Sequence, residues 1–263
     1  MIVLVTGATS GFGAEMARKF AQHGHKVIAT GRRQDRLDEL AAEIGPAVLT
    51  VPMDVTDKAS ITAALASLPA EWQEIDVLIN NAGLALGVAP AQSASLEQWE
   101  TMIETNCKGL VTVTRLLLPE MLKRNRGTII NISSSAGAYA YPGANVYGAS
   151  KAFVDQFTRN LRADLVGTGV RASNIAPGLA GGTEFSNVRL KDDAAAAKVY
   201  EGTVPLSPAD IAETAYWIAT LPAHVNINHI ELMPTCQGFG PLFIKRNTCL
   251  LYTSDAADEG LGV

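Results

Sequence analysis

Short apolar segments rich in β-branched residues alternate with helical patterns along most of this chain. Such alternation is typical of a parallel β-sheet, because each parallel strand needs a crossover helix that returns the chain to the same edge. The predicted strands are Ile2–Thr6, Lys26–Thr30, Ala47–Pro52, Asp76–Asn80, Gly127–Ser133, Val170–Ala176 and Asn226–Leu232. We therefore predict a single α/β domain, a Rossmann-type doubly wound sheet of about seven strands with helices on both faces.

The helical patterns lie between these strands. A long one runs from about Leu96 to Arg124, with a bend expected near Pro119, and the segment from Gly178 to Glu201 is predicted to be a mobile flap. The others are Gly11–His23, Asp35–Ile44, Lys58–Leu68, Val146–Val166 and Pro208–Thr220. In sheets of this kind ligands bind at the carboxyl ends of the strands, which is where the unusual residues fall.

Composition narrows the class of partner. The 263 residues are 48% hydrophobic and 18% charged, which is enough to bury a large core, and the net charge is −5 without a basic cluster. This balance disfavours nucleic acid and anionic membranes, so we expect a small-molecule substrate. The apolar start Ile2–Val5 is too short for a secretory signal and no apolar run approaches membrane-spanning length, so we expect a cytoplasmic protein. Cys107, Cys236 and Cys249 have no paired spacing, and we assign no metal.

A glycine-rich turn follows the first strand and opens the first helix. Its glycines, Gly7, Gly11 and Gly13, have the spacing Gly-x-x-x-Gly-x-Gly. Glycines there let the backbone approach a pyrophosphate, which the N-terminal dipole of the helix stabilises. A tight turn with no ligand is the alternative for an isolated match, but the position favours a phosphate loop. The cofactor-binding residues predicted here are Gly7, Thr9, Ser10, Gly11, Phe12 and Gly13.

Arg32 and Arg33 follow the second strand, where an enzyme selective for NAD usually carries an acid that binds the ribose. Guanidinium groups match a phosphate ester in shape and charge, so we predict NADP rather than NAD. The alternative is that both arginines are solvated residues at a helix start, and Asp35 nearby calls for caution.

Further contacts with the cofactor are predicted at the next two strand ends. Asp54 and Val55 are placed to reach the adenine edge, and Asn81, Ala82 and Gly83 lie where the fourth strand ends. Both groups can also be explained as caps of strands or helices.

Tyr147 and Lys151 are four residues apart on a predicted helix, so their side chains share one face. An ammonium group beside a phenol favours the phenolate and lowers a pKa that is normally about 10. Tyr147 can then act as a general acid or base, and Ser134, at the end of the preceding strand, can hold the substrate oxygen. An isolated Tyr-x-x-x-Lys pair is weak evidence for catalysis. Because Ser134 and the glycine turn also occur in the expected order along the chain, the pair is predicted to belong to a catalytic set. Asn106 is a further candidate, since it could hold a water through which protons reach Lys151.

The order and spacing of these segments resemble the short-chain dehydrogenase/reductase family over residues 1–233. The resemblance implies hydride transfer with a tyrosine acid or base, in which the nicotinamide and Lys151 depress the Tyr147 pKa. Lys151 would also hold the nicotinamide ribose. The resemblance also implies contacts with the nicotinamide end of the cofactor, made by Pro177, Gly178, Leu179, Thr183 and Phe185.

The flap from Pro177 to Arg189 and the segment from Val27 to Arg33 resemble more closely the subgroup of NADP-dependent 3-hydroxy acid dehydrogenases. That subgroup is similar to serine and L-allo-threonine dehydrogenases that also reduce malonic semialdehyde. The implied substrates are serine, L-allo-threonine, 3-hydroxypropionate and malonic semialdehyde, with Ser134 and Tyr147 binding the reacting oxygen. Arg189 is a candidate for the substrate carboxylate, with a surface salt bridge as the alternative.

Two other functions stay open at this stage. One is a broad carbonyl or 3-oxoacyl thioester reductase, and the other is a protein that senses NADP(H) without turnover, which the set Ser134, Tyr147 and Lys151 disfavours. The family resemblance also implies a homotetramer through the two long helices that carry Asn106 and Tyr147, although core packing explains their apolar residues equally well.

The last residues do not fit this pattern. The run from Cys249 to Glu259 matches the translation of a transposase adapter used in shotgun sequencing libraries. We therefore predict that residues 1–248 form the NADP-binding domain and that residues 249–263 are a non-native, disordered tail. A natural polar tail that happens to match is the alternative.

Overall fold

The computed structural model describes residues 1–239 and 244, so the predicted tail at 249–263 lies outside the described residues. The seven described strands form one parallel sheet in the order β3-β2-β1-β4-β5-β6-β7. This order confirms the predicted doubly wound sheet. The strands are β1 (Ile2–Thr6), β2 (Lys26–Gly31), β3 (Val48–Pro52), β4 (Val77–Asn80), β5 (Gly127–Ile132), β6 (Val170–Pro177) and β7 (His229–Leu232).

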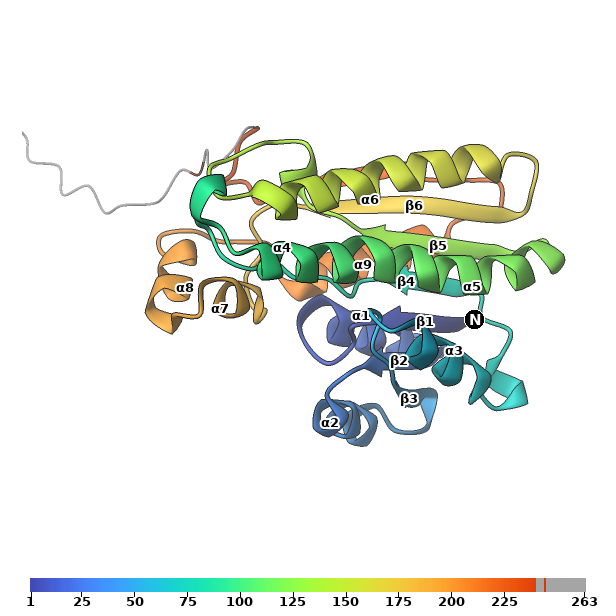
Figure 1. Cartoon of the computed structure of the whole chain (residues 1–263). Helices are drawn as coiled ribbons and strands as arrows, with labels where there is room; N and C mark the ends of the chain where they lie inside the picture. The colour runs from blue at the N-terminus through green and yellow to red at the C-terminus, as the bar shows by residue number, and fades with distance from the viewer. Residues whose placement is uncertain (240–243, 245–263) are drawn as a thin grey trace, which may run out of the picture.

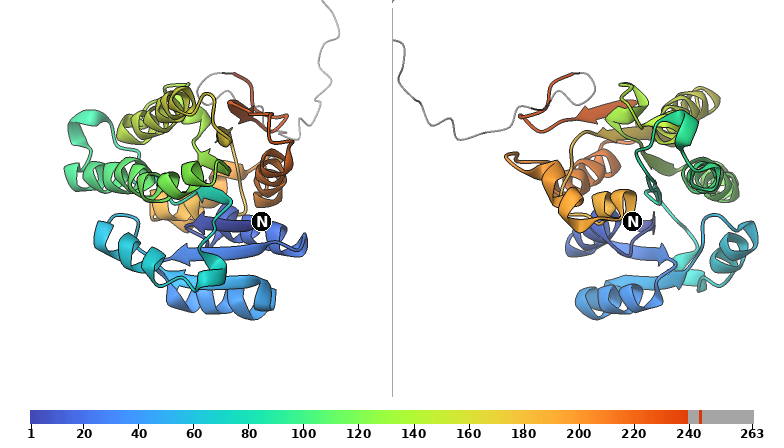
Figure 2. Two further views of the ribbon diagram at one scale, coloured as in Figure 1. Left: turned by 90° about the vertical axis from the view of Figure 1, so that its right-hand side faces the viewer. Right: turned by 60° about the vertical axis from the view of Figure 1, so that its left-hand side comes forward.

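Helices cover both faces of this sheet (Figures 1 and 2). One face packs against α1 (Gly11–Gln22), α2 (Gln34–Ile44) and α9 (Pro208–Thr220). The other packs against α3 (Lys58–Ala66), α5 (Leu110–Lys123) and α6 (Asn145–Asp164). The remaining helices are α4 (Leu96–Ile103), α7 (Phe185–Leu190) and α8 (Asp193–Tyr200).

The strands alternate between the two hydrophobic cores with a period of two residues. Val3 and Val5 of β1 lie in the core beneath α1, whereas Leu4 between them lies in the core beneath α3 and α5. All three side chains are fully buried, as expected for a parallel sheet covered on both faces. The sheet is therefore a rigid support, and loops at its carboxyl edge carry the polar residues.

The long helix predicted from Leu96 to Arg124 is interrupted by a π-helical segment at Glu104–Gly109, between α4 and α5. Helix α5 continues through Pro119, and a bend at this residue stays a prediction. The π-helical segment holds Asn106, which is almost completely buried.

The predicted flap is more ordered in its secondary structure than expected, because it contains the helices α7 and α8. Side-chain hydrogen bonds join them, from Ser186 to Tyr200 and from Asn187 to Asp193. Both helices lie beyond the carboxyl ends of the strands, at the left of Figure 1. The flap therefore covers the edge of the sheet at which ligands of such folds bind.

Within the described residues, no helix has the length and apolar character needed to cross a membrane.

Candidate active site

A cavity of about 390 Å³ opens at the carboxyl edge of the sheet, between the glycine turn and the flap. Its volume lies within the range of small-molecule sites. Most of the predicted cofactor residues line it, which brings together segments far apart in the chain. They are Gly7, Thr9, Ser10, Gly11, Phe12, Arg32, Arg33, Asp54, Val55, Asn81, Ala82, Gly83, Tyr147, Pro177, Gly178, Thr183 and Phe185. Gly13, Lys151 and Leu179 were also predicted to bind the cofactor but are not among its lining residues.

The glycine turn has the geometry of a phosphate loop. Gly7 and Gly11 have φ angles of +67° and +51°, in the left-handed region that side chains disfavour. Ser10 is the N-cap residue of α1, yet its side chain makes no capping hydrogen bond, so the first N–H groups of the helix stay available to an anion.

Asn81 and Thr6 fix this turn against β4. The amide of Asn81 donates hydrogen bonds to the carbonyl oxygens of Thr6 and Gly7, at 2.9 and 3.1 Å. The Thr6 hydroxyl accepts hydrogen bonds from the backbone N–H groups of Asn81 and Ala82. The Asn81 side chain therefore positions the phosphate loop, and Thr6 is a positioning residue that the sequence reasoning missed.

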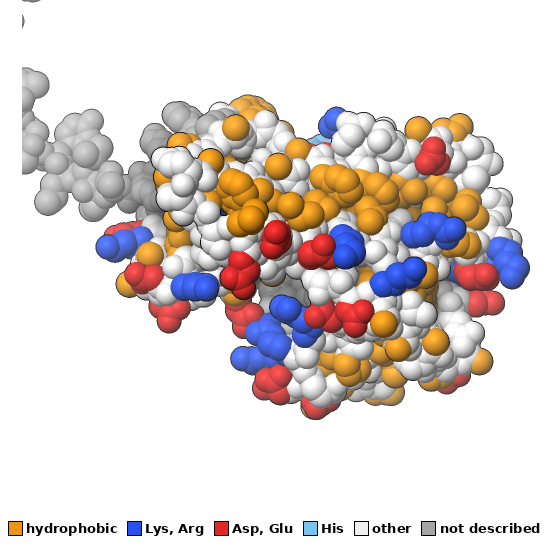
Figure 3. Space-filling model, viewed as in Figure 1, with side chains coloured by type: hydrophobic (Ala, Val, Ile, Leu, Met, Phe, Trp, Pro, Cys, Tyr) orange, Lys and Arg blue, Asp and Glu red, His pale blue; other side chains and the backbone are white. Residues whose placement is uncertain are grey.

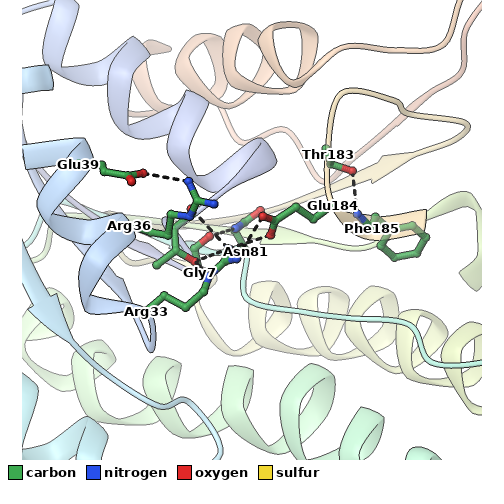
Figure 4. A network of polar contacts seen from close by, with 9 residues as sticks. Gly7, Arg33, Arg36, Glu39, Asn81, Thr183, Glu184 and Phe185 are labelled. Atoms are coloured by element: carbon green, nitrogen blue, oxygen red, sulfur yellow. Dashed lines mark hydrogen bonds and ion pairs between the residues drawn. The ribbon is translucent and has the colours of Figure 1, made fainter. Parts of the chain in front are cut away.

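Arg33 is held at the mouth of the cavity. Its guanidinium donates to the Thr9 hydroxyl at 3.1 Å and forms a two-pronged ion pair with Glu184 of the flap, at 3.1 and 2.8 Å (Figure 4). Arg32 lines the same cavity. Asp54 accepts hydrogen bonds from both the backbone N–H and the hydroxyl of Thr56, so its carboxylate orients the turn after β3.

The catalytic candidates meet beside this cavity. Ser134 and Tyr147 share a hydrogen bond, and the Lys151 ammonium lies 5.9 Å from the centre of the Tyr147 ring. Lys151 Nζ donates to the carbonyl oxygen of Ile132 at 3.0 Å. Tyr147 and Lys151 are almost completely buried. The shared helix face predicted from their spacing is thus present, and Ser134 lies beside the tyrosine.

The protonation states differ from the expectation that Lys151 lowers the Tyr147 pKa. Burial raises the pKa of Tyr147 to about 12, and the opposing effects come from the hydrogen bond with Ser134 and the charge of Arg189. Burial also lowers the pKa of Lys151 to about 8. In the protein alone, desolvation therefore outweighs the attraction between ammonium and phenolate, and Tyr147 is a neutral acid at neutral pH.

The buried ammonium predicts a pH-dependent stability. Because the folded pKa of Lys151 is lowered from 10.5 to about 8, the unfolded chain binds more protons between these values, and stability rises with pH there. Between about pH 7 and 9.5, we expect the unfolding free energy of the wild type to rise by about 2 kcal/mol relative to Lys151→Met. Urea denaturation at both pH values measures this difference, and a constant difference would contradict the assigned pKa.

The Asn106 side chain joins the segment after β4 to helix α6 by hydrogen bonds. Its amide oxygen accepts a hydrogen bond from the backbone N–H of Leu84, and its nitrogen donates to the Leu84 carbonyl and the Ser150 hydroxyl. These bonds hold the chain after Gly83 against α6. A β-carbon on Gly83 would lie 3.2 Å from Lys151 Nζ, so these hydrogen bonds of Asn106 hold the backbone of Gly83 close to the lysine ammonium. The role of Asn106 in holding a water stays a prediction.

The flap contributes the other wall of the site. Phe185 packs on Tyr147 with ring centres 5.6 Å apart, and the Arg189 guanidinium lies 5.5 Å from the centre of the Tyr147 ring. Arg189 donates to the carbonyl of Gly87 at 3.2 Å and to the Tyr141 hydroxyl at 2.9 Å. The cation of the flap is therefore held beside the Tyr147 phenol, and Tyr141 is a second positioning residue missed from the sequence.

Leu179 is held from a more distant part of the chain. Its backbone N–H donates to the side chain of Gln237 at 2.6 Å, while the N–H of Gly178 donates to the Leu232 carbonyl. These bonds fix the start of the flap at the end of β6.

Among the residues described, no cluster of three or more His, Cys, Asp or Glu side chains is arranged to hold a metal ion.

The glycine loop, the set of Ser134, Tyr147 and Lys151, and the doubly wound sheet are features of one class of oxidoreductase. The family model for short chain dehydrogenases matches residues 1–194. The chain therefore belongs to the short-chain dehydrogenase family.

Individual relatives narrow the comparison. An NADP-dependent 3-hydroxy acid dehydrogenase of Salmonella typhi is 61% identical over 248 residues, which cover 94% of this chain and all of that protein. Sulfoacetaldehyde reductase 2 of Chromohalobacter salexigens is 50% identical over 250 residues, or 94% of this chain and 99% of that protein. The closed form of a serine dehydrogenase complexed with NADP⁺ has a TM-score of 0.91 and 60% identity, covering 94% of this chain and all of that one.

Proposed function

We propose that this protein is an NADP-dependent dehydrogenase that interconverts small 3-hydroxy acids and the corresponding 3-oxo acids. The observation that carries the proposal is the cation Arg189, held 5.5 Å from the ring centre of the buried acid Tyr147. A substrate with a carboxylate near its reacting oxygen fits this pair of charge and proton donor. The likeness to 3-hydroxy acid and serine dehydrogenases supports it.

The residues present suit a phosphorylated dinucleotide. A β-carbon on Gly13 would come 2.6 Å from the Asn81 amide nitrogen, so glycine here lets the start of α1 pack closely on the turn that would hold the phosphates. Arg32 and Arg33 offer guanidinium donors at the end of β2, where the ribose of a dinucleotide binds in this fold. When bound, the cofactor would supply the site that accepts or gives the hydride.

The chain's own residues would handle the substrate oxygen and its proton. In reduction, the neutral phenol of Tyr147 donates its proton to the carbonyl oxygen as the hydride reaches carbon. In oxidation, the phenolate of Tyr147 takes the proton of the substrate hydroxyl group and becomes the neutral phenol. Ser134 holds that oxygen next to the phenol, and Phe185 limits the access of water. Burial keeps Tyr147 protonated in the protein alone, so oxidation requires that the phenol first lose its proton.

Arg189 has donors to spare for a carboxylate. A guanidinium has five N–H groups, and the hydrogen bonds to Gly87, Tyr141 and Gly143 use one from each nitrogen. One N–H is left on each terminal nitrogen, which is the pair that binds a carboxylate with two parallel hydrogen bonds.

The absorbance of NADPH tests this function directly. We expect reduction of malonic semialdehyde, and oxidation of 3-hydroxypropionate and L-serine with NADP⁺. In Arg189→Met, kcat/KM for 3-hydroxypropionate should fall about 100-fold, because a charged hydrogen-bonding partner is lost. The neutral 3-hydroxypropionamide measures any damage to Tyr147 packing, since it does not use the cation. Equal losses for the acid and the amide would refute carboxylate binding by Arg189.

Cofactor selectivity gives a second test. In Arg33→Ala we expect kcat/KM with NADPH to fall about 100-fold, since a charge-assisted bond to the 2′-phosphate is lost, while the value with NADH changes less than about threefold. Parallel assays with both cofactors and one substrate measure the ratio. An equal fall with NADH would assign Arg33 to the fold rather than to the phosphate.

We also propose a homotetramer assembled through the α5 and α6 faces. Apolar side chains gather in a band over these helices (Figure 3), including Phe153, which is 42% exposed and stacks on Phe157. An exposed apolar band of this kind is typical of an interface between subunits. Light scattering would give a mass of four chains.

We further propose a cytoplasmic location, with which the free thiols of Cys107 and Cys236 agree.

A further inference from the structure

We propose that Glu184 is a built-in competitor of the cofactor's 2′-phosphate, and that binding of this phosphate frees the flap that faces the catalytic tyrosine. The inference rests on the proposed use of NADP and adds a residue that sets how tightly and how selectively the cofactor binds.

The position of the Glu184 carboxylate is the first observation. It meets both terminal nitrogens of Arg33, at 3.1 and 2.8 Å, so it uses the face of the guanidinium that would bind a phosphate ester (Figure 4). Hydrogen bonds from Arg33 and Ser10 hold the pKa of Glu184 below its usual range, so the group is a carboxylate at neutral pH. The phosphate subsite is thus filled by an anion of the chain itself.

The local structure does not otherwise need this ion pair. Glu184 is the N-cap residue of α7, yet its side chain makes no capping hydrogen bond to that helix. The side chains of Arg33 and Glu184 are 41% and 44% exposed, and pairs this exposed add little to stability. Meanwhile Thr9 of the glycine loop holds the Arg33 guanidinium from its other side. The arginine is therefore fixed on the cofactor side, and its flap partner is the one that can be exchanged.

A carboxylate and a phosphate dianion repel each other, and both would use the two terminal nitrogens of the one guanidinium. NADP(H) must therefore displace Glu184, whereas NAD(H) has no phosphate there and can leave the ion pair intact. Glu184 directly precedes Phe185, which packs on Tyr147, and Thr183 beside it touches the glycine loop. Exchange of the carboxylate for the phosphate would release this segment at the moment when the correct cofactor has bound.

The test is a comparison of dissociation constants for the wild type and Glu184→Gln, which keeps the side-chain shape and removes the charge. NADPH and NADH are titrated by fluorescence, and adenosine 2′,5′-bisphosphate and ADP by calorimetry, all without substrate. We expect the two ligands with a 2′-phosphate to bind about fivefold more tightly to the variant, and NADH and ADP to be unchanged. The gain should vanish in an Arg33→Ala background.

Glu43→Gln is the matched control, because it removes the same charge from α2, where Glu43 pairs with Arg18 at 2.7 Å. It should leave all four constants unchanged. The inference is overturned if Glu184→Gln leaves the NADPH constant unchanged or weakens it, or if NADH gains as much. If the wild type binds NADPH no more tightly than NADH, the cofactor assignment itself fails, and this inference fails with it.

Hydrogen exchange of residues 183–190 reports on the flap. With adenosine 2′,5′-bisphosphate, which has no nicotinamide end to order the flap, the amides of α7 should exchange faster than with ADP. Equal exchange with both ligands would show that the phosphate does not release the segment.

Discussion

Replacement of Tyr147 with phenylalanine should lower kcat about 1,000-fold in both directions while the NADPH dissociation constant changes less than about threefold. The substitution removes one oxygen, the atom that shares a hydrogen bond with Ser134 and exchanges the proton with the substrate. The ring keeps its neighbours, with Phe185 and Arg189 at 5.6 and 5.5 Å. Chemistry is therefore lost without loss of the fold or of the cofactor site.

Three measurements together make this result decisive. Absorbance at the NADPH band gives turnover, fluorescence gives cofactor affinity, and urea denaturation shows whether the unfolding free energy stays within about 1 kcal/mol of the wild type. Ser134→Ala is the graded comparison, since it removes a group that orients the oxygen but leaves the proton donor. If Tyr147→Phe keeps wild-type turnover, the tyrosine is not the acid or base. If the wild type binds NADPH without turnover, the chain is a cofactor-binding protein.

The fold was largely predictable because its signals are local. The buried parallel strand β1 begins with an unbroken apolar run, and the predicted start of α9 coincides with the observed one because Ser207, Pro208 and Asp210 form a clear capping signal. The residues predicted to bind the cofactor and to act in catalysis lie close together for a related reason. In a parallel sheet all strands end at one edge, so residues placed at strand ends in the sequence must meet in space.

The features that were missed depend on tertiary contacts. The ion pair of Arg33 with Glu184 joins residues 151 positions apart, and no local pattern predicts it. The π-helical segment around Asn106 arises from backbone hydrogen bonds that shift register, which leaves no mark in the side-chain pattern. Helix α8 did have a signal, since Asp192 caps a run of alanines, but a helix this short is stable only when packed.

Electrostatics were predicted least well. The spacing of Tyr147 and Lys151 indicates that their side chains share a helix face, and the structure agrees. It does not indicate how deeply both groups are buried, and burial decides the pKa of each. In the protein without its cofactor, the net shift of the Tyr147 pKa is therefore upward, opposite to the shift inferred from the proximity of Lys151.

The second large effect is expected from one methyl group in the phosphate loop. In Gly13→Ala the added carbon would collide with the carbonyl oxygen of Gly7 and come 2.6 Å from the amide nitrogen of Asn81. Because the first of these is backbone, no side-chain rotation relieves the clash, and the loop itself must move. We expect a loss of about 3 kcal/mol in unfolding free energy and at least about 100-fold weaker NADPH binding.

Gly24→Ala separates loop geometry from the general cost of replacing a glycine. Gly24 has a φ of +76°, so alanine is strained there, but no atom lies within 4 Å of the added carbon. This variant should lose about 1 kcal/mol of stability and keep its NADPH affinity, because the strain is confined to a turn after α1. The difference in NADPH affinity between Gly13→Ala and Gly24→Ala therefore measures the effect of the loop geometry alone. If Gly13→Ala binds NADPH as tightly as Gly24→Ala does, the close approach of Gly13 to Gly7 serves only packing between α1 and β1, and the phosphates must bind elsewhere along the cavity.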